Sequence, residues 1–245
     1  MNWILLQEGE VDAGGLAVLA GRRAQHVIGV LQSRVGDRVR VGVVGGARGE
    51  ARVTAIDGDR VRLRCDLAEK RDRPRLGLIL ALPRPKVMKR LWVPLGSIGL
   101  DRIVVTNAER VERAYFDTHW LQERHYSALL LTGMEQTGET AFPAVMLRKR
   151  LKPFVEDELD GLFPGHDRLL ARPGTGTPLH GFRPGRTGRA VVAIGPEGGW
   201  SAYETDLFAR RAFEPVTLGR RALRTDTACV AILAALQAIL EEGET

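Results

Sequence analysis

The chain has 245 residues, of which 44% are hydrophobic and 27% are charged, a balance typical of a globular protein with one or two domains. The two cysteines, Cys65 and Cys229, are far apart and lack the spacing of a metal site, which argues against a disulfide framework or a bound zinc ion. The most apolar segment, residues 228–240, is too short for a membrane span, and the N-terminus lacks the features of a signal peptide, so we expect a cytoplasmic protein without a metal.

The charge is distributed unevenly along the chain. The net charge is +6, but residues 1–100 carry 18 Lys and Arg against 10 Asp and Glu, whereas residues 101–245 carry 18 against 20. A positive excess in the first part fits a module that faces a polyanion, followed by a nearly neutral module. A solvated surface explains the charge alone equally well, so the motifs have to identify the partner.

Residues 1–67 have the pattern of short β-strands, in which polar and apolar side chains alternate. Turn signals, at Gly45-Gly46 and Asp57-Gly58, separate these runs. Several short strands with tight turns predict a small β-barrel. In the last run, the positions expected to face the core are Val61, Leu63, Cys65 and Leu67. The arginines expected to share the opposite face, and predicted to bind RNA, are Arg60, Arg62 and Arg64.

The charged residues 68–75 show no apolar periodicity and are the expected linker, with a first domain at residues 1–72 and a second at residues 73–245. In the second domain strand and helix patterns alternate, which predicts an α/β fold with a mostly parallel sheet. Strands are expected at residues 76–82, 102–106, 144–147, 168–171, 190–194 and 215–218. Helices are expected near residues 86–98, 117–134, 153–162, 201–212 and 225–241, and a loop at residues 174–188.

One segment, Val191-Val-Ala-Ile-Gly-Pro-Glu-Gly-Gly-Trp-Ser201, runs from an apolar strand into a glycine-rich turn. Glycines in such a turn allow positive φ and let the backbone approach a ligand closely. Ser201 and Glu204 have the spacing of a capping box at the start of the next helix. Ligands of open α/β sheets gather at the carboxyl ends of the strands, although a plain strand-to-helix turn explains this segment as well.

A second segment, Val216-Thr-Leu-Gly-Arg-Arg-Ala-Leu-Arg-Thr-Asp-Thr-Ala228, leads from a strand through a basic loop into a long helix. Thr225 is the expected N-cap, and Asp226 lies in the first turn. The helix is almost wholly apolar, which predicts that it is buried or packs against a partner subunit. For the three loop arginines, at 220, 221 and 224, anion binding is at least as good an explanation as simple surface charge.

Together the segments Ile194-Gly-Pro-Glu-Gly-Gly-Trp200 and Leu218-Gly-Arg-Arg-Ala-Leu-Arg-Thr-Asp-Thr-Ala228 resemble the SPOUT methyltransferases of the RsmE type. Three weaker matches, at residues 26–37, 80–86 and 135–138, extend the resemblance over the whole chain. Members of that family methylate N3 of a uridine in small-subunit (16S) ribosomal RNA. The chain therefore resembles a methyltransferase that acts on ribosomal RNA, with the assembled 30S subunit as its expected substrate.

The resemblance implies an N-terminal PUA-like β-barrel and a C-terminal SPOUT domain with a deep trefoil knot. It also implies a homodimer that binds S-adenosyl-L-methionine in its knot loops. The residues that the resemblance assigns to the cofactor are Leu170, Ile194, Gly195, Gly198, Gly199, Leu218, Gly219 and Leu223. Two further arginines of the basic loop, Arg220 and Arg221, are expected to contact RNA.

Methylation of uracil N3 requires loss of a weakly acidic imide proton, alignment of the reactants and extraction of the base from its stack. We expect Arg224 to stabilise the uracil anion or to bind a phosphate. Glu197 is the candidate base or orienting residue, but satisfying backbone N–H groups of its own turn is an equally good interpretation. Asp226 is expected to be a helix-start residue rather than a base, and His26 and Trp200 are expected to have structural roles.

The chain departs from the family pattern outside the two cofactor segments. Its stretch at residues 91–99 lacks the usual Lys and Glu and contains Pro94, which should kink or end a helix. Arginines usual in the family are replaced here by Gly29, Gln32 and Glu139. These changes leave the cofactor segments intact and leave the exact target nucleotide open.

Three alternatives remain. A SPOUT methyltransferase acting on tRNA or on a ribose 2′-OH would be distinguished by nucleoside analysis of its product. A cofactor-binding ribosome assembly factor without activity would bind cofactor and transfer no methyl group. A generic ATP- or NAD-binding protein is disfavoured, because the chain has no Walker lysine motif and no Gly-x-Gly-x-x-Gly after a strand.

Overall fold

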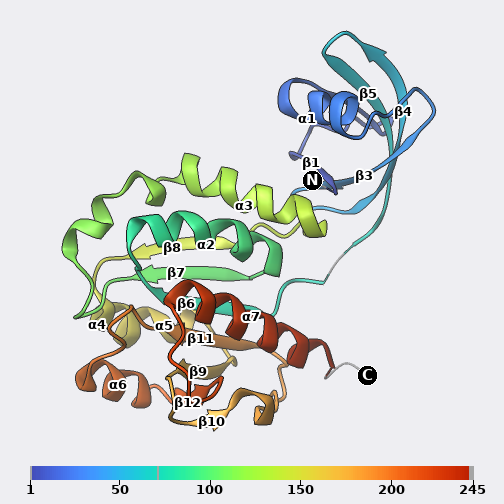
Figure 1. The fold of residues 1–245 in the computed structure, drawn as a ribbon. Coiled ribbons are helices and arrows are strands. Elements are labelled where there is room, and N and C mark those ends of the chain that lie inside the picture. The colour runs from blue at the N-terminus through green and yellow to red at the C-terminus, as the bar shows by residue number, and fades with distance from the viewer. Residues whose placement is uncertain (1, 71, 243–245) are drawn as a thin grey trace.

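The computed structural model describes residues 2–70 and 72–242, which form two sheets joined by one connecting segment (Figure 1). The N-terminal sheet has the strand order β1-β3-β4-β5-β2. Its elements are β1 (Ile4–Leu6), β2 (Leu16–Leu19), α1 (Gly21–Gln25), the π-helical turn η1 (His26–Val30), β3 (Arg38–Val43), β4 (Arg48–Asp57) and β5 (Arg60–Glu69). Within the described residues the edge strands β1 and β2 do not pair, so the sheet is an open half-barrel and the expected closed barrel is confirmed only in part.

The core of this half-barrel follows the predicted alternation along β5. Val61 and Leu63 are fully buried and Cys65 and Leu67 are half-buried, whereas Arg60, Arg62 and Arg64 are exposed. The predicted arginine stripe is therefore present on one face of the strand. Turns of positive φ at Gly45 (φ +75°) and Gly58 (φ +60°) join the neighbouring strands, as the turn signals predicted.

The second domain is an α/β domain with a seven-stranded sheet in the order β10-β12-β9-β11-β6-β7-β8, and every pairing in it is parallel. Its strands are β6 (Leu76–Ala81), β7 (Arg102–Thr106), β8 (Ala144–Arg148), β9 (Asp167–Ala171), β10 (Thr177–Pro178), β11 (Ala190–Ile194) and β12 (Glu214–Thr217). Its α-helices are α2 (Pro85–Ile98), α3 (Glu123–Thr137), α4 (Leu151–Pro153), α5 (Leu159–Leu162), α6 (Ala202–Ala209) and α7 (Thr225–Glu242). Shorter helical turns are η2 (Arg113–Asp117), η3 (His119–Leu121), η4 (Phe154–Glu158) and η5 (Leu179–Gly181).

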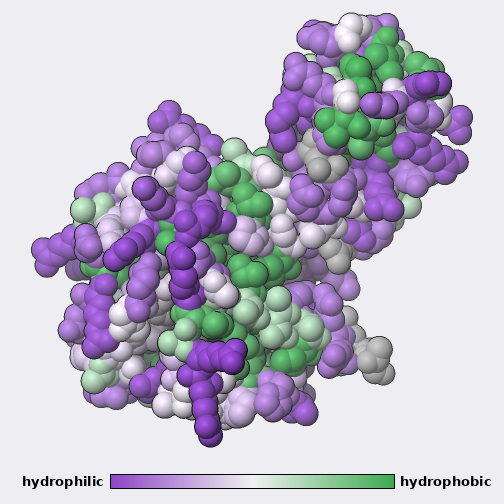
Figure 2. Space-filling model, in the orientation of Figure 1, coloured by the Kyte–Doolittle hydropathy of each residue, from purple (hydrophilic) through white to green (hydrophobic). Residues whose placement is uncertain are grey.

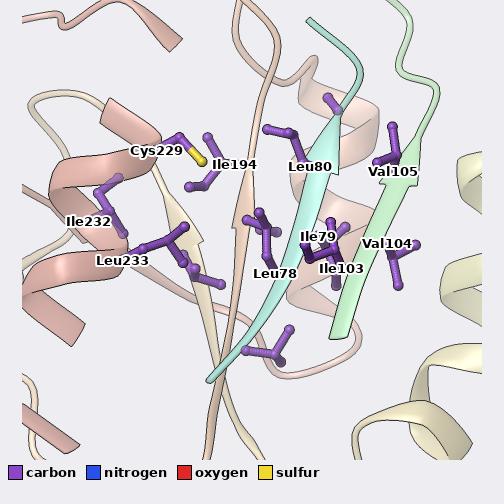
Figure 3. Close-up of a cluster of buried hydrophobic side chains, with 14 of the residues drawn as sticks. Leu78, Ile79, Leu80, Ile103, Val104, Val105, Ile194, Cys229, Ile232 and Leu233 are labelled. Carbon is purple, nitrogen blue, oxygen red and sulfur yellow. The ribbon is translucent and has the colours of Figure 1, made fainter. Parts of the chain in front are cut away.

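The long helices α2 and α7 lie side by side over the centre of this sheet, and α3 packs beside α2 (Figure 1). Figure 3 shows Cys229, Ile232 and Leu233 of α7 directed towards the strand that carries Ile194. All four side chains are at least nine-tenths buried, as are the strand residues of β6 and β7 in the same view. The buried half of α7 holds the segment that follows β12 against the middle of the sheet. Burial was one of the two outcomes predicted for this almost wholly apolar helix.

The predicted elements agree with the observed ones within a few residues, with four corrections. The helix predicted from residue 117 begins at Glu123, because the residues before it form the separate turns η2 and η3. The linker is shorter than expected, because β5 continues to Glu69 through its pairing with Arg48. The predicted loop at residues 174–188 contains β10 and η5, since Thr177 and Pro178 pair with β12 at the sheet edge. Pro94 neither ends nor interrupts α2, which continues to Ile98 before Gly99 (φ +77°) terminates it.

The two domains are joined by direct contacts at the end of α3. The backbone N–H groups of Asn2 and Trp3 donate to the carbonyl of Glu135 (3.1 and 2.9 Å), and the Glu135 carboxylate accepts from Arg22 Nη2 (2.9 Å). Gly45 N–H donates to the carbonyl of Thr140 (2.7 Å). The segment at residues 135–138, one of the weaker matches in the sequence, thus lies at the joint between the domains.

Candidate functional site

The carboxyl ends of three neighbouring strands, β9, β11 and β12, surround one pocket of about 300 Å³. We call it the glycine-loop pocket. Its walls come from the three segments that follow these strands and from the first turns of α7. The residues that line it are Ala171–Pro173, Thr175, Ile194–Glu197, Gly199, Trp200, Val216–Gly219, Arg221–Leu223, Thr225, Ala228 and Ile232. A ligand at this place follows the rule that open parallel sheets bind at the carboxyl ends of their strands.

Local chemistry explains the shape of the two glycine loops. Gly199 has φ +71° and Gly219 has φ +130°, conformations that side chains other than glycine rarely adopt. A Cβ on Gly195 would lie 3.2 Å from the Trp200 ring, so glycine is needed there for close packing. After the first loop Ser201 and Glu204 form the predicted capping box, which begins α6.

Six of the eight predicted cofactor residues line the glycine-loop pocket. These are Ile194, Gly195, Gly199, Leu218, Gly219 and Leu223. Leu170 does not, because its side chain is buried in the core (2% exposed) and its neighbour Ala171 reaches the pocket instead. Gly198 is also outside the lining; it accepts a hydrogen bond from Arg110 through its carbonyl.

Two features of this pocket point to a ligand with both apolar and polar parts. Leu218 and Leu223 are 44% and 41% exposed at its wall, although large apolar side chains are usually buried. Trp200 Nε1 is buried and has no hydrogen-bond partner among the described residues, although Trp200 lines the pocket. A buried indole N–H without an acceptor is costly, and a ligand acceptor in the pocket would relieve that cost.

A second pocket, of about 480 Å³, shares a wall with the first. We call it the Glu197–Arg224 pocket. The residues that line it are Arg84, Val87, Glu197 and Ala222–Asp226. Four of these residues also line the glycine-loop pocket, namely Glu197, Ala222, Leu223 and Thr225. The two catalytic candidates predicted from the sequence, Glu197 and Arg224, are therefore brought to one cavity directly beside the predicted cofactor residues.

Three ionised side chains connect α2, the basic loop and α7 at this pocket. Arg90 Nη2 donates to Asp226 Oδ2 (2.7 Å), and Arg224 Nε lies 3.8 Å from Asp226 Oδ1. The hydrogen bond from Arg90 holds the pKa of Asp226 below its ordinary value, so the carboxylate stays ionised. Asp226 is in the first turn of α7, as predicted, but it is also the anchor for two arginines.

The Glu197 side chain is exposed and accepts a long hydrogen bond from the backbone N–H of Arg84 (3.4 Å). It therefore joins the loop after β11 to the loop before α2, and it does not bind N–H groups of its own turn in the described structure. Arg84 and Arg90 were not singled out from the sequence. Arg84 lies in the weaker match at residues 80–86, which could have pointed to it, whereas Arg90 lies outside that match.

The two remaining loop arginines lie at different places. Arg221 lines the glycine-loop pocket, whereas Arg220 is exposed and lines neither pocket. Among the described residues no cluster of three or more His, Cys, Asp or Glu side chains has the arrangement of a metal site. In the part of the chain that the structure describes, every helix is too short or too polar to cross a membrane.

Comparison with known proteins connects this geometry with an activity. The sequence model of the RNA methyltransferase domain family matches residues 70–237. The ribosomal RNA small subunit methyltransferase E of Treponema pallidum is 30% identical over 97% of this chain and 91% of its own length. The chain belongs to this family of RNA methyltransferases. The family named from the two glycine-loop segments is thus confirmed.

Two solved structures share the whole fold of this methyltransferase. A ribosomal RNA small subunit methyltransferase E from Neisseria gonorrhoeae, solved with bound S-adenosyl methionine, has a TM-score of 0.76 at 23% identity and covers 98% of both chains. A Legionella pneumophila methyltransferase, solved with the same cofactor, has a TM-score of 0.71 at 24% identity and covers 97% of both chains. The similarity extends through both sheets, so these proteins share the overall fold.

Proposed function

We propose that this methyltransferase transfers the methyl group of S-adenosylmethionine to N3 of a uridine in 16S ribosomal RNA, with the assembled small subunit as substrate. The observation that carries the proposal is the shared wall between the glycine-loop pocket and the Glu197–Arg224 pocket. A methyl donor in the first pocket and a base in the second would meet across that wall. The names of the relatives support ribosomal RNA as the substrate class.

The residues of the glycine-loop pocket fit the proposed cofactor. Apolar side chains of Ile194, Leu218 and Leu223 offer a surface for a purine ring, and the positive φ of Gly199 and Gly219 exposes backbone groups to a ligand. Trp200 Nε1 needs an acceptor, and Arg221 in the same wall suits a carboxylate. When bound, S-adenosylmethionine supplies an electrophilic methyl group.

The Glu197–Arg224 pocket has the groups that uracil chemistry requires. Deprotonation at N3 produces an anion delocalised over the ring, and a guanidinium stabilises such a charge without needing to change its own protonation state. Arg224 supplies that cation, and the ion pair with Asp226 limits its motion. Glu197 supplies a carboxylate that either accepts the imide proton or orients the base.

We further propose how the protein binds RNA, how its chain is knotted and how two copies of it associate. The exposed stripe at Arg60, Arg62 and Arg64 and the loop residues Arg220 and Arg221 supply cations for the ribosomal RNA. The N-terminal half-barrel serves as the PUA-like RNA-binding module. The path of the chain supports the trefoil knot. β12 lies next to β9, on the side away from β11, and the helix α7 that follows β12 then crosses back over β11 and β6. The partly exposed alanine face of α7 would contact a second copy of the chain.

Calorimetric titration with S-adenosylmethionine tests the cofactor half of this proposal. Replacing Gly199 by alanine places a side chain at φ +71°, at a cost of about 1–2 kcal/mol. The free loop of the variant can relax away from this conformation and must return to it on binding, so we expect up to roughly tenfold weaker binding. The matched control is Gly161→Ala, because Gly161 is exposed, helical and free of close neighbours. Absence of binding by the unmodified protein would contradict the proposal.

A further inference from the structure

The exposed side of α2 carries a row of cations beside the Glu197–Arg224 pocket. Lys86, Lys89 and Arg90 are all exposed and are spaced so that they share one face of the helix, and Arg84 precedes the helix in the pocket wall. We call these four residues the α2 cation row. The helix contains no Asp or Glu anywhere between Pro85 and Ile98. The positive charge of the row is therefore not offset within its own element.

Of the cations in the α2 cation row, the two lysines can bind an anion without first breaking an ion pair to another described residue. Arg90 is paired with Asp226, but within the described residues neither Lys86 nor Lys89 has an ion pair. Lys86 is also unfavourably placed in the free protein, since a cation in the first turn of a helix opposes its dipole and acidic residues are preferred there. An anion that lies against Lys86 would offset this unfavourable charge.

An aromatic cluster continues the row away from the pocket. The Lys89 ammonium lies over the Trp120 ring, 4.4 Å from its centroid, and His119 and His125 lie against the same ring (4.2 and 5.7 Å between centroids). Cations interleaved with aromatic rings suit a single RNA strand, whose phosphates take the cations and whose bases take the rings. In Figure 2 the surface over the start of α2 is hydrophilic, whereas the surface over α7 is largely apolar.

We infer that the α2 cation row is a binding surface for the RNA backbone next to the methylated nucleotide. The inference rests on the proposed function, because it assigns the Glu197–Arg224 pocket to the extracted base. A nucleotide pulled out of its stack needs its flanking phosphates held in place, and Arg84 belongs both to the row and to the pocket wall. RNA that enters the pocket would thus pass over Lys86 and Lys89.

The test compares the double variant Lys86→Gln/Lys89→Gln with the unmodified protein on small ribosomal subunits, as a function of salt. We expect the KM for the RNA substrate to rise roughly tenfold, and the slope of log affinity against log salt to lose about 1 for each lysine. The affinity for S-adenosylmethionine should not change. The charge-preserving variant Lys86→Arg/Lys89→Arg should keep the salt slope of the unmodified protein.

The matched control removes two cations elsewhere, with Arg186→Gln/Arg210→Gln. Both arginines are exposed, and they precede the amino ends of β11 and β12, whereas the pockets lie at the carboxyl ends of the strands. An unchanged salt slope in the lysine variant, with normal methyl transfer by the unmodified protein, would overturn the inference while leaving the proposed function intact. An unchanged slope with an altered oligomeric mass would overturn it in favour of a contact between copies of the chain. If the unmodified protein transferred no methyl group to the subunits, the proposed function itself would be refuted.

Discussion

Arg90 in α2 and Asp226 in α7 are 136 positions apart in the sequence, and their side chains are joined by a hydrogen bond of 2.7 Å. The pair connects the first long helix of the catalytic domain to the last one, at the wall of the Glu197–Arg224 pocket. The same carboxylate is 3.8 Å from Arg224. Asp226 therefore places a negative charge between the cation of α2 and the cation of that pocket.

Replacing Asp226 by asparagine should lower kcat for methyl transfer. Asparagine keeps the shape and loses the charge that attracts Arg90 and Arg224. Both arginines are more than half exposed, and ion pairs of this kind contribute about 0.2–1 kcal/mol, so we expect a loss of up to roughly fivefold. Asp226→Glu should recover part of the rate, because it restores the carboxylate. Steady-state kinetics with a separate measurement of cofactor affinity check this; equal kcat values for the Asn variant and the unmodified protein would show that the carboxylate does not position Arg224.

Replacing Arg224 by alanine should abolish transfer and spare the cofactor. Removal of a cation that stabilises a developing anion typically costs about two to three orders of magnitude in rate. Because Arg224 lines only the second pocket, the Kd for S-adenosylmethionine should stay within about twofold. Single-turnover kinetics and calorimetry measure the two effects, with Arg210→Ala as an exposed control. Normal turnover in the Arg224 variant would remove this residue from the mechanism.

Glu197→Gln separates the two roles considered for this side chain. Glutamine can still accept the hydrogen bond from the backbone N–H of Arg84, but it cannot take a proton at neutral pH. If the carboxylate is the base, kcat/KM falls by roughly two orders of magnitude and the acidic limb of the pH profile disappears. A variant with the rate and pH profile of the unmodified protein would mean that Glu197 only joins the two loops.

The sequence predicted the sheet well because its central strands are continuous apolar runs bounded by turn residues, as at residues 76–81 and 190–194. The family resemblance of the two glycine segments supplied the six cofactor residues that line the glycine-loop pocket, because a glycine turn after a strand is equally well explained without a ligand. It could not choose between Leu170 and Ala171, because β9 is covered on both faces and alternation gives no direction. The pairing of Arg90 with Asp226 depends on how two distant helices pack, which no local pattern encodes.

Acidification should destabilise the protein through His166. This histidine is buried, its Nδ1 lies 3.1 Å from the carbonyl of Pro164, and burial lowers the pKa of the ring. A group whose folded pKa is lowered stabilises the fold fully above its unfolded value, about 6.5, and that contribution is lost as the pH falls through the folded value. The free energy of unfolding should therefore decrease from about pH 7.5 to about pH 5. A His166→Gln variant should show a smaller decrease; an equal decrease would exclude His166 as its source.

The thiol of Cys229 should be unreactive in the folded protein. Burial raises its pKa to about 12, so the reactive thiolate is almost absent at neutral pH. Figure 3 shows the sulfur directed into the core towards Ile194. In a Cys65→Ser variant, Ellman's reagent should detect no thiol until denaturant is added. Rapid labelling under native conditions would show that the start of α7 opens more easily than its packing implies.

The proposed activity is tested most directly by transfer of a labelled methyl group from S-adenosylmethionine to small ribosomal subunits that lack N3-methyluridine, followed by nucleoside mass spectrometry. The proposed function predicts labelled 3-methyluridine in the 16S RNA of the assembled subunits. Label on a ribose 2′-OH or on tRNA would contradict the proposed target. Cofactor binding without transfer to any RNA would contradict the activity itself and indicate an assembly factor.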